Sequence, residues 1–246
     1  MCQVTCVRCP RRAGFTLLEA LVIVGIITLL IGLVVTGLGR ARESGRRAVC
    51  LNHVRQVSAA LVSYATENDQ YFPAKAENLN PNSADWIYWQ ASRDWRQSAL
   101  GPFLGGPTGF NQEVLRCPTD ELDRRVRGTT DPYLYSYTLN GRFAAIPDAS
   151  TDPSKYPPGP FRLRDIPNAP DKILLVDEDA QSLDDGNFNP TLVGKPLENY
   201  LATRHDGDRQ VDGGKGNIGM ADGHAEWVER TYVRDVHHFE PAAPLH

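Results

Sequence analysis

The 246-residue chain lacks several features that would point to a common biochemical function. Its net charge of -4 and its pI of about 5.9 give no broad basic surface, which argues against a nucleic-acid partner. No glycine-rich phosphate loop is present, and no nucleophile, base and orienting residue form a recognisable catalytic motif. Proline is missing from residues 15–72, and long apolar runs are missing after Leu38. We therefore expect neither nucleic-acid binding nor enzyme activity.

Cysteine is scarce and unevenly placed. Three of the five cysteines, Cys2, Cys6 and Cys9, lie in the first nine residues, and only Cys50 and Cys117 follow. In an oxidising compartment these last two would form one disulfide that closes a loop of more than 60 residues, worth roughly 4 kcal/mol. The alternative is a pair of buried free thiols. The first three cysteines have no fourth ligand nearby, so we expect no metal site there.

The chain does contain one long apolar segment near its N-terminus. Residues 15–39 carry a single charge, Glu19, and a helix of this length spans about 37 Å, enough to cross a bilayer. The run is too long for a secretory signal peptide, and no small-x-small cleavage site follows it. A plain signal anchor leaves Glu19 unexplained, because a carboxylate in a membrane helix costs a few kcal/mol. Glu19 is therefore either functional or reaches back to the cytoplasmic interface.

The segment around this carboxylate, Arg11-Arg12-Ala13-Gly14-Phe15-Thr16-Leu17-Leu18-Glu19-Ala20-Leu21-Val22, resembles the processing site of type IV prepilins and type II secretion pseudopilins. In that family a dedicated aspartyl peptidase removes a short basic leader after its last Gly, and the new N-terminal Phe is N-methylated. The resemblance implies cleavage between Gly14 and Phe15 and N-methylation of Phe15. It also implies that Glu19, the fifth residue of the mature chain, acts in assembly.

Elementary electrostatics supports a role for Glu19 in assembly. Cleavage creates an α-amino group on Phe15, and Glu19 of a neighbouring subunit can neutralise it within lipid. Such a contact is heterologous and non-closing, which is the symmetry that builds filaments.

A helical pattern continues beyond the apolar segment to about Asn68. Its apolar stripe predicts packing on a sheet, and it comprises Ala41, Ala48, Leu51, Val54, Val57, Leu61, Val62 and Ala65. The stretches 50–56 and 64–69 resemble pilin-like proteins with a long C-terminal domain, which are abundant in planctomycete-type bacteria.

The remainder of the chain reads as short strands joined by long loops. Strands are predicted at 133–139 and 172–176, and an Asp-Gly hairpin is predicted between residues 216–220 and 225–228. Three tryptophans, Trp86, Trp89 and Trp95, lie in an irregular segment. They predict either the plug of a small core or a platform for glycans.

The C-terminal residues add to the resemblance. The same pilin-like proteins often carry a histidine, about nine residues and then Asp-Gly, and here His205 precedes Asp222 and Gly223 with sixteen residues between His205 and Asp222. Residues 208–215 therefore resemble an insertion. Together with His224, His205 and Asp222 could alternatively form a transition-metal hydrolase site, although structural roles are the simpler interpretation.

The same loop carries three carboxylates, Asp206, Asp208 and Asp212. Oxygen ligands in a glycine-rich loop suit calcium, although a solvated turn is the simpler alternative.

These observations predict an α+β, pilin-like fold in which a long N-terminal helix packs on an antiparallel sheet. The expected parts are a basic leader at 1–14, a transmembrane helix at 15–39, an amphipathic stem helix at 40–70 and a globular domain at 71–246. The resemblance implies a structural subunit of a type II secretion pseudopilus or a type IV pilus. It would lie in the cytoplasmic membrane as a single-pass protein, with its C-terminal domain periplasmic or extracellular.

The expected partners are prepilin peptidase, other pilin or pseudopilin subunits, the inner-membrane assembly platform and the cytoplasmic membrane. We expect no cofactor apart from the calcium alternative. The second function considered is a membrane-tethered binding module that uses the tryptophans and does not polymerise.

Overall fold

The computed structural model describes residues 14–76, 84–105, 112–122, 133–143, 161–190, 199–206 and 213–244. The chain divides into two compact units, Met1–Glu43 and Ser44–His246, and the long helix α1 contributes residues to both.

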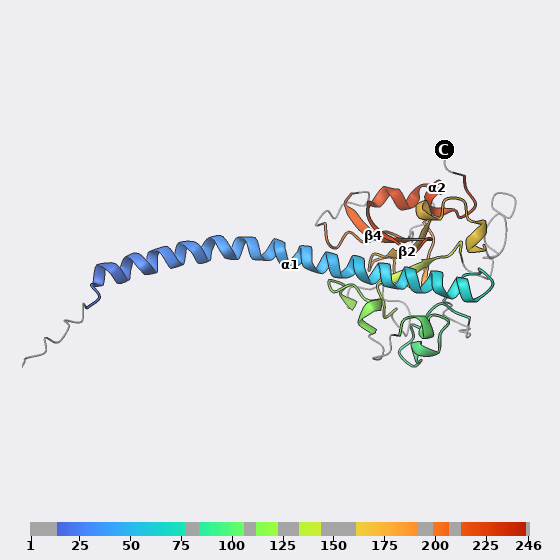
Figure 1. Ribbon diagram of the computed structural model, residues 1–246, viewed down its shortest axis with the longest axis horizontal. Helices are drawn as coiled ribbons and strands as arrows, with labels where there is room; N and C mark the ends of the chain where they lie inside the picture. Colours follow the sequence, from blue (N-terminus) through green and yellow to red (C-terminus); the bar gives the residue numbers. More distant parts are fainter. Residues whose placement is uncertain are drawn as a thin grey trace, which may run out of the picture. The chain divides into compact units, whose positions relative to one another are not determined.

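Helix α1 runs without a break from Leu17 to Glu67, which confirms the uninterrupted helix predicted from the sequence (Figure 1). It begins after Thr16 and continues because no proline removes a backbone donor from its interior. It ends where Asp69 and Gln70 adopt left-handed backbone angles, with φ of 53° and 70°. The Gln70 amide then donates to the Ala65 carbonyl at 2.8 Å, so one terminal carbonyl of the helix is satisfied.

The second part of α1 forms one wall of the core of the Ser44–His246 unit. Cys50, Val54, Val57 and Leu61 are all fully buried, and their spacing of three and four residues places them on one face of the helix. The predicted stripe was wrong at its N-terminal end, because Ala41 and Ala48 are both exposed. The buried stripe begins at Cys50, where the helix meets the sheet.

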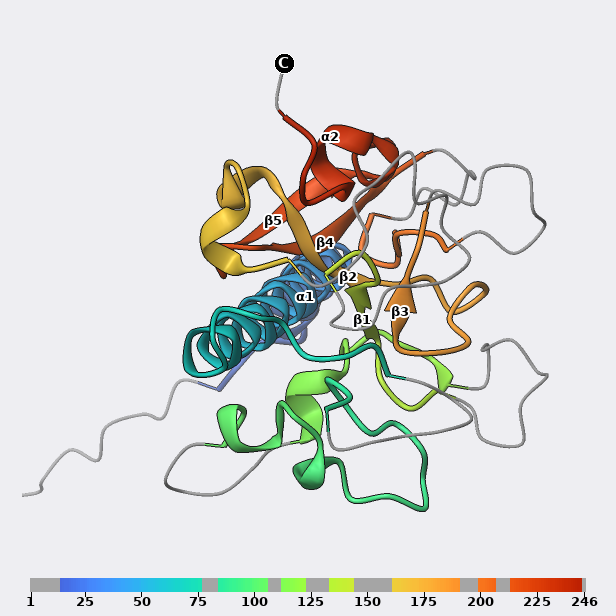
Figure 2. The same cartoon turned by 90° about the vertical axis from the view of Figure 1, so that its right-hand side faces the viewer.

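One five-stranded sheet lies against this face of α1, and Figure 2 shows its strands beside the helix. The strand order is β3-β1-β2-β4-β5, and all neighbours are antiparallel except β1 and β3. The strand bounds are Tyr137–Asn140 for β1, Ile173–Asp177 for β2, Asn187–Phe188 for β3, Lys215–Met220 for β4 and Ala225–Glu229 for β5. This architecture confirms the predicted α+β class.

The predicted strands agree with the structure except in one place. The apolar run ending at Val176 forms the central strand β2, buried on both faces, and the Asp-Gly turn joins β4 to β5. Gly223 in that turn has φ of +92°, which an L side chain rarely adopts. The strand expected from Tyr133 was too long at its start, because pairing begins only at Tyr137. Tyr133 and Tyr135 lie before the ladder, and their hydroxyls donate to the Tyr137 and Tyr88 carbonyls.

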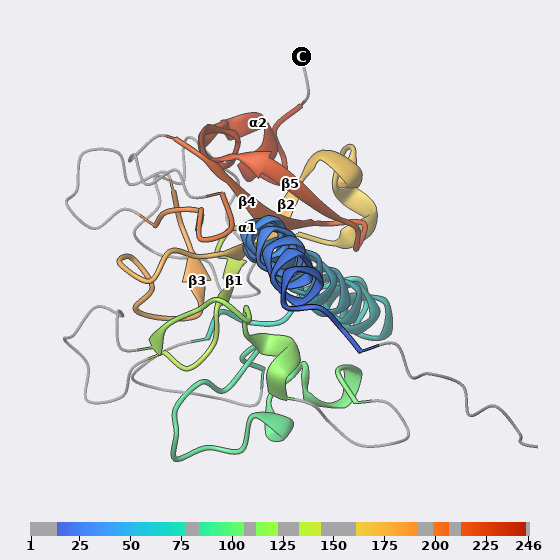
Figure 3. The ribbon, with the colours of Figure 1, turned by 90° about the vertical axis from the view of Figure 1, so that its left-hand side faces the viewer.

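Each face of the sheet is covered by a different group of elements. On one face Gly219 of β4 lies so close to α1 that an added Cβ would stand 1.8 Å from Ser58 Oγ. On the other face Ile173, Val176 and Ile218 join an apolar cluster with Phe239. Phe239 belongs to the short helix α2, Val236–Phe239, which lies on the side of β4 away from α1 in Figure 3.

The tryptophans fill the core beneath the sheet. Trp86 and Trp89 are fully buried and Trp95 is 5% exposed, while Trp86 Nε1 donates to the Gly186 carbonyl at 2.9 Å. Trp95 belongs to the short 3-10 helix η1 (Trp95–Gln97), and residues of η2 (Gly101–Phe103) and η3 (Gln112–Leu115) pack in the same cluster. The core interpretation of the tryptophans is therefore confirmed. A glycan platform is ruled out for these three side chains, because a ligand could not reach their ring faces.

Candidate functional site

The first candidate site is the N-terminal end of α1, which carries the residues of the processing motif. Gly14 and Phe15 are exposed and precede the helix. Glu19 Oε2 accepts hydrogen bonds from both the backbone amide and the hydroxyl of Thr16, each at 2.8 Å. The Glu19 amide donates to Thr16 Oγ1 at 3.2 Å in return. Thr16 and Glu19 therefore form a capping box, which satisfies free amides at the start of the helix.

The capping box gives Glu19 a local role that the sequence analysis missed. Its signal is present in the sequence, since Thr-x-x-Glu directly before an apolar run is the pattern of such a box. The box occupies Oε2, and Oε1 takes no part in these three bonds. The carboxylate is thus held at the helix terminus through Oε2.

The apolar surface of the following turns is exposed. The large apolar side chains described between Leu17 and Leu38 are 43% to 83% accessible. This helix is long and apolar enough to cross a membrane, on the criteria of length and composition alone. Together with the processing motif, this surface is consistent with a membrane-anchored chain whose C-terminal region lies outside the cytoplasm.

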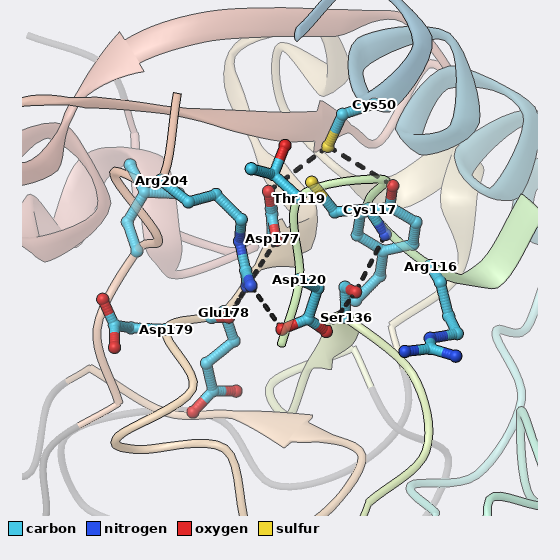
Figure 4. Close-up of polar contacts among 12 residues, drawn as sticks. Cys50, Arg116, Cys117, Thr119, Asp120, Ser136, Asp177, Glu178, Asp179 and Arg204 are labelled. Atoms are coloured by element: carbon cyan, nitrogen blue, oxygen red, sulfur yellow. Dashed lines mark hydrogen bonds and ion pairs between the residues drawn. The ribbon is translucent and has the colours of Figure 1, made fainter. Parts of the chain in front are cut away.

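The second candidate site lies in the Ser44–His246 unit, where four potential ligand residues converge. They are Cys50 on α1, Cys117 just after η3, Asp177 at the end of β2, and His205. One ligand atom from each lies within 4.8 Å of the others. Cys117 Sγ is 3.0 Å from His205 Nε2, and Cys50 Sγ donates to Asp177 Oδ2 at 3.3 Å. Figure 4 shows the two sulfur atoms facing each other beside Asp177.

The structure therefore brings Cys50 and Cys117 together but does not join them. Both are buried free thiols, and the predicted disulfide is not formed. Each sulfur instead has another polar neighbour. Cys50 Sγ lies 3.4 Å from the Tyr137 hydroxyl in addition to Asp177, and Cys117 Sγ lies against His205. Of the two alternatives left open by the sequence, the structure has the pair of buried thiols.

An arginine and a second carboxylate complete the polar network. Arg204 Nη2 donates to Asp177 Oδ1 at 3.0 Å, and Arg204 Nη1 donates to Asp120 Oδ1 at 2.5 Å (Figure 4). Asp120 Oδ2 also accepts from the Ser136 hydroxyl at 2.6 Å, and Ser136 Oγ accepts the Cys117 amide at 2.9 Å. The guanidinium therefore lies between two buried carboxylates.

The contacts in this network shift the pKa values of its side chains in different directions. Burial opposes ionisation of Cys117, but hydrogen bonds with Cys50 and His205 and the charge of Arg204 outweigh it and lower the thiol pKa to about 4. Burial raises the pKa of Asp177 to about 8 in spite of Arg204. Burial also raises the pKa of Cys50, and Asp177 and Cys117 add to that rise. The two sulfur atoms are therefore chemically unequal.

The C-terminal motif residues do not form one site. His205 joins the cysteines, and its Nδ1 lies 3.3 Å from Thr119 Oγ1. Asp222 and His224 lie in the turn between β4 and β5, where Asp222 Oδ1 is 2.5 Å from His224 Nδ1. Gly223 of that turn is next to Ala59, nine residues beyond Cys50 and thus about 13 Å further along α1. A hydrolase centre that combines His205, Asp222 and His224 is therefore wrong.

The calcium alternative concerns a loop that is only partly described. Asp206 is exposed, and its Oδ2 accepts the Lys215 amide at 2.7 Å. Asp208 and Asp212 lie outside the described residues. The calcium site stays a prediction.

Sequence reasoning missed the contribution of Asp177, Arg204 and Asp120 to the second site. Asp177 stood out only as the first acid after an apolar run, and that position does carry a signal. An acidic residue at the end of a buried central strand must find a partner inside the protein. Arg204 directly precedes His205, but no local pattern reveals that it pairs with residues 27 and 84 positions away.

Comparison with known proteins gives one finding. Residues 9–35 match the family described as Prokaryotic N-terminal methylation motif. Comparison of the chain with curated proteins and with solved structures gave no match. The matched segment contains Gly14, Phe15 and Glu19, so the chain carries a prepilin-type motif of the kind found in pilins and pseudopilins that prepilin peptidase processes.

Proposed function

We propose that the chain is a pilin-like structural subunit that is cut after Gly14 and then assembles into a type II secretion pseudopilus or a type IV pilus. The observation that carries this proposal is the prepilin-type motif on residues 9–35, at the start of an exposed apolar helix. An apolar helix of this kind needs lipid or other subunits around it, because water cannot solvate its surface favourably. Filament assembly supplies both environments in turn.

The proposal assigns a task to each part of the chain. Residues 1–14 are the leader that prepilin peptidase removes, and residues 15–39 hold the subunit in the cytoplasmic membrane and later form contacts within the filament. Residues 40–70 are the stem on which the globular domain, residues 71–246, is built. The remaining partners are an N-methylating activity for Phe15, the inner-membrane assembly platform and other pilin-like subunits.

Glu19 is proposed to pair with the α-amino group of Phe15 on a neighbouring subunit. Within lipid an unpaired carboxylate and an unpaired ammonium are both costly, so their pairing favours one axial register of the filament. The capping box supports this role, since Oε2 is held by Thr16 while Oε1 takes no part in the box. The amine exists only after cleavage, which couples processing to assembly.

The alternative, a tethered binding module, has lost its expected binding surface. It relied on Trp86, Trp89 and Trp95, and all three are buried. No observation on the described residues favours it over a structural subunit.

Two variants separate the charge of Glu19 from its capping role. Glu19→Gln keeps an acceptor for the Thr16 amide, and therefore keeps the capping box, but removes the charge. Thr16→Ala keeps the charge but removes the hydroxyl, at a local cost of about 0.5–2 kcal/mol. Both should be cleaved normally, because the Gly14–Phe15 junction is unchanged. Glu19→Gln should lose incorporation into filaments, and Thr16→Ala should retain it.

Sheared filaments are collected by sedimentation, and subunits are crosslinked within them, beside an immunoblot of the cleaved chain. If Glu19→Gln assembles like the parent, the charge pair is wrong. If Thr16→Ala fails as completely as Glu19→Gln, Glu19 acts through the capping box and the intersubunit pair is again wrong.

A further inference from the structure

We propose that Cys50, Cys117, Asp177 and His205 form a binding site for a divalent transition metal, with zinc as the preferred ion. The four side chains come from α1, the segment after η3, the end of β2 and the residues that precede β4. Two thiolates, an imidazole and a carboxylate are the ligand types of tetrahedral zinc sites. The proposal concerns only the Ser44–His246 unit and does not depend on filament assembly.

The spacing of the ligand atoms suits a metal better than a disulfide. Zinc bonds of about 2.0–2.3 Å place neighbouring ligand atoms of a tetrahedron roughly 3.2–3.8 Å apart. The four atoms already lie within 4.8 Å of one another, with Cys117 Sγ 3.0 Å from His205 Nε2 and Cys50 Sγ 3.3 Å from Asp177 Oδ2. A disulfide would require the sulfur atoms to approach to about 2.05 Å, and it would involve neither His205 nor Asp177. A metal uses all four.

The charges around the four residues also favour a cation. Arg204 stands beside Asp177, but it is shared with Asp120, whose side chain is fully buried. The Asp120 carboxylate therefore offsets the guanidinium. Two thiolates and the Asp177 carboxylate can then offset the positive charge of a bound divalent ion.

Outer contacts hold the ligands in place. His205 Nδ1 lies 3.3 Å from Thr119 Oγ1, which fixes the ring so that Nε2 faces Cys117. Asp177 Oδ1 is held by Arg204, so Oδ2 faces Cys50. Metal-binding imidazoles and carboxylates are commonly oriented by such second contacts.

A buried amide provides independent support. The pairing of Val176 with Ile218 places Asn217 of β4 opposite Asp177. Asn217 is fully buried, and neither its Oδ1 nor its Nδ2 has a hydrogen-bond partner among the described residues. A buried amide of this kind is costly unless a further polar group enters beside it. A cation beside Asp177, or a water molecule that it holds, would be such a group.

The expected role of the metal is structural. All four ligands are protein groups and three of them are buried, which leaves no open position for a substrate. The ion would join the stem helix to two loops and the central strand. Because these four segments are far apart in sequence, binding would be coupled to the folding of the unit.

Cobalt is the probe for the test, since it replaces zinc and reports its ligands by absorption. The full chain is purified in detergent with Cys2, Cys6 and Cys9 changed to serine, so that the leader contributes no thiolate. After reduction and removal of metal, one cobalt ion per chain should give the visible bands of tetrahedral coordination and a thiolate-to-cobalt charge-transfer band. Zinc should displace it, raise the thermal unfolding midpoint and protect Cys50 and Cys117 from alkylation.

The variants identify the ligands. Cys50→Ser with Cys117→Ser should abolish the charge-transfer band, and His205→Ala or Asp177→Asn should weaken cobalt binding by at least about tenfold. His224→Ala is the matched control, because His224 binds Asp222 in the β4–β5 turn, and it should bind cobalt like the parent.

The parent chain, in which all four proposed ligands are intact, tests the proposal even if a variant does not fold. If the fully reduced parent gives no thiolate-to-cobalt band and no zinc protection of its thiols, the site does not exist. A band that survives in the double cysteine variant would equally overturn it. A third result would also overturn it: acid trapping at lysis shows a Cys50–Cys117 disulfide, and the chain takes up no cobalt after that disulfide is reduced.

Discussion

The two parts of helix α1 share one backbone conformation but meet opposite environments. Before Glu43 the large apolar side chains that the structure describes are 43% or more exposed, whereas beyond Ser44 the residues Cys50, Val54, Val57 and Leu61 are fully buried. The first part is apolar on all sides. The second part has one apolar stripe that covers a sheet. A continuous helix can thus serve as a core element at one end and offer an unsatisfied apolar surface at the other.

The difference shows which contacts must stabilise each part of the helix. The buried stripe is stabilised within the chain, since roughly 25 cal/mol is gained for each Å² of apolar surface removed from water. The exposed part gains nothing comparable inside the chain, so its partners must be lipid or other subunits. The comparison predicts that equal substitutions in the two parts have unequal effects on folding.

The largest expected effect is the removal of a buried leucine. Leu61→Ala leaves a cavity at a fully buried position and should lower the free energy of unfolding by about 2–5 kcal/mol. Leu30→Ala, at a position 54% exposed, should leave that free energy unchanged. Denaturant unfolding of the full chain in detergent, followed by tryptophan fluorescence, measures both. Equal losses in the two variants would contradict the division of the helix.

The second effect tests the close approach of α1 to the sheet. In Gly219→Ala the new Cβ would stand 1.8 Å from Ser58 Oγ and 3.3 Å from Val54 Cγ1, so the variant should lose about 1–3 kcal/mol of stability. Gly25→Ala is the matched control, because nothing lies within 4 Å of its added Cβ. Ser58→Ala combined with Gly219→Ala should recover part of the loss. Full additivity of the two changes would show that α1 does not press on Gly219.

The third and smallest effect concerns pH and belongs to the packed unit alone. Burial, with the nearby charge of Asp184, raises the pKa of Asp185 to about 6, although hydrogen bonds from Asn187 oppose the rise. The folded chain therefore keeps the Asp185 proton to higher pH than the unfolded chain, and stability falls as pH rises from about 4 to about 6. Asp185→Asn should remove this fall and be more stable than the parent by about 1–2 kcal/mol above pH 6.

The measurement is the difference between the unfolding free energies of Asp185→Asn and the parent across this pH range. That difference isolates Asp185 from the other buried acids. Glu229→Gln, which removes an exposed carboxylate, is the control and should follow the parent. A difference curve that stays flat between pH 4 and 6 would refute the assigned pKa.

Whether a feature of this structure could be predicted from the sequence depends on how far apart in the chain the interacting residues lie. The helix, the strand ending at Val176 and the β4–β5 hairpin rest on periodicity and turn chemistry within a few residues, and these predictions were confirmed. The start of the buried stripe was misplaced because burial at Cys50 depends on where the sheet lies. Tyr133 was assigned to a strand because alternation marks burial but does not show whether a neighbouring strand is present to pair with it.

The candidate sites divide in the same way. The processing motif is contiguous, so residues 9–35 suffice to recognise it. The network around Cys50 is assembled from segments as far apart as Cys50 and His205, which are 155 positions apart in the chain, and no local pattern indicates that Asp177 and His205 meet the two cysteines. Sequence reasoning did find both cysteines and the histidine. It predicted a disulfide between the two cysteines, whereas the structure has two free thiols.

We propose above that cleavage after Gly14 leaves Phe15, just before the exposed part of α1, as the N-terminus of a processed subunit. Mass spectrometry of the N-terminal peptide tests it most directly, on chain extracted from membranes of cells with and without an active prepilin peptidase. When the peptidase is active, the chain should begin at Phe15 and carry one added methyl group on its amine, and when the peptidase is absent the chain should be unprocessed. A chain that keeps Gly14 and the preceding residues in cells with active peptidase would contradict it.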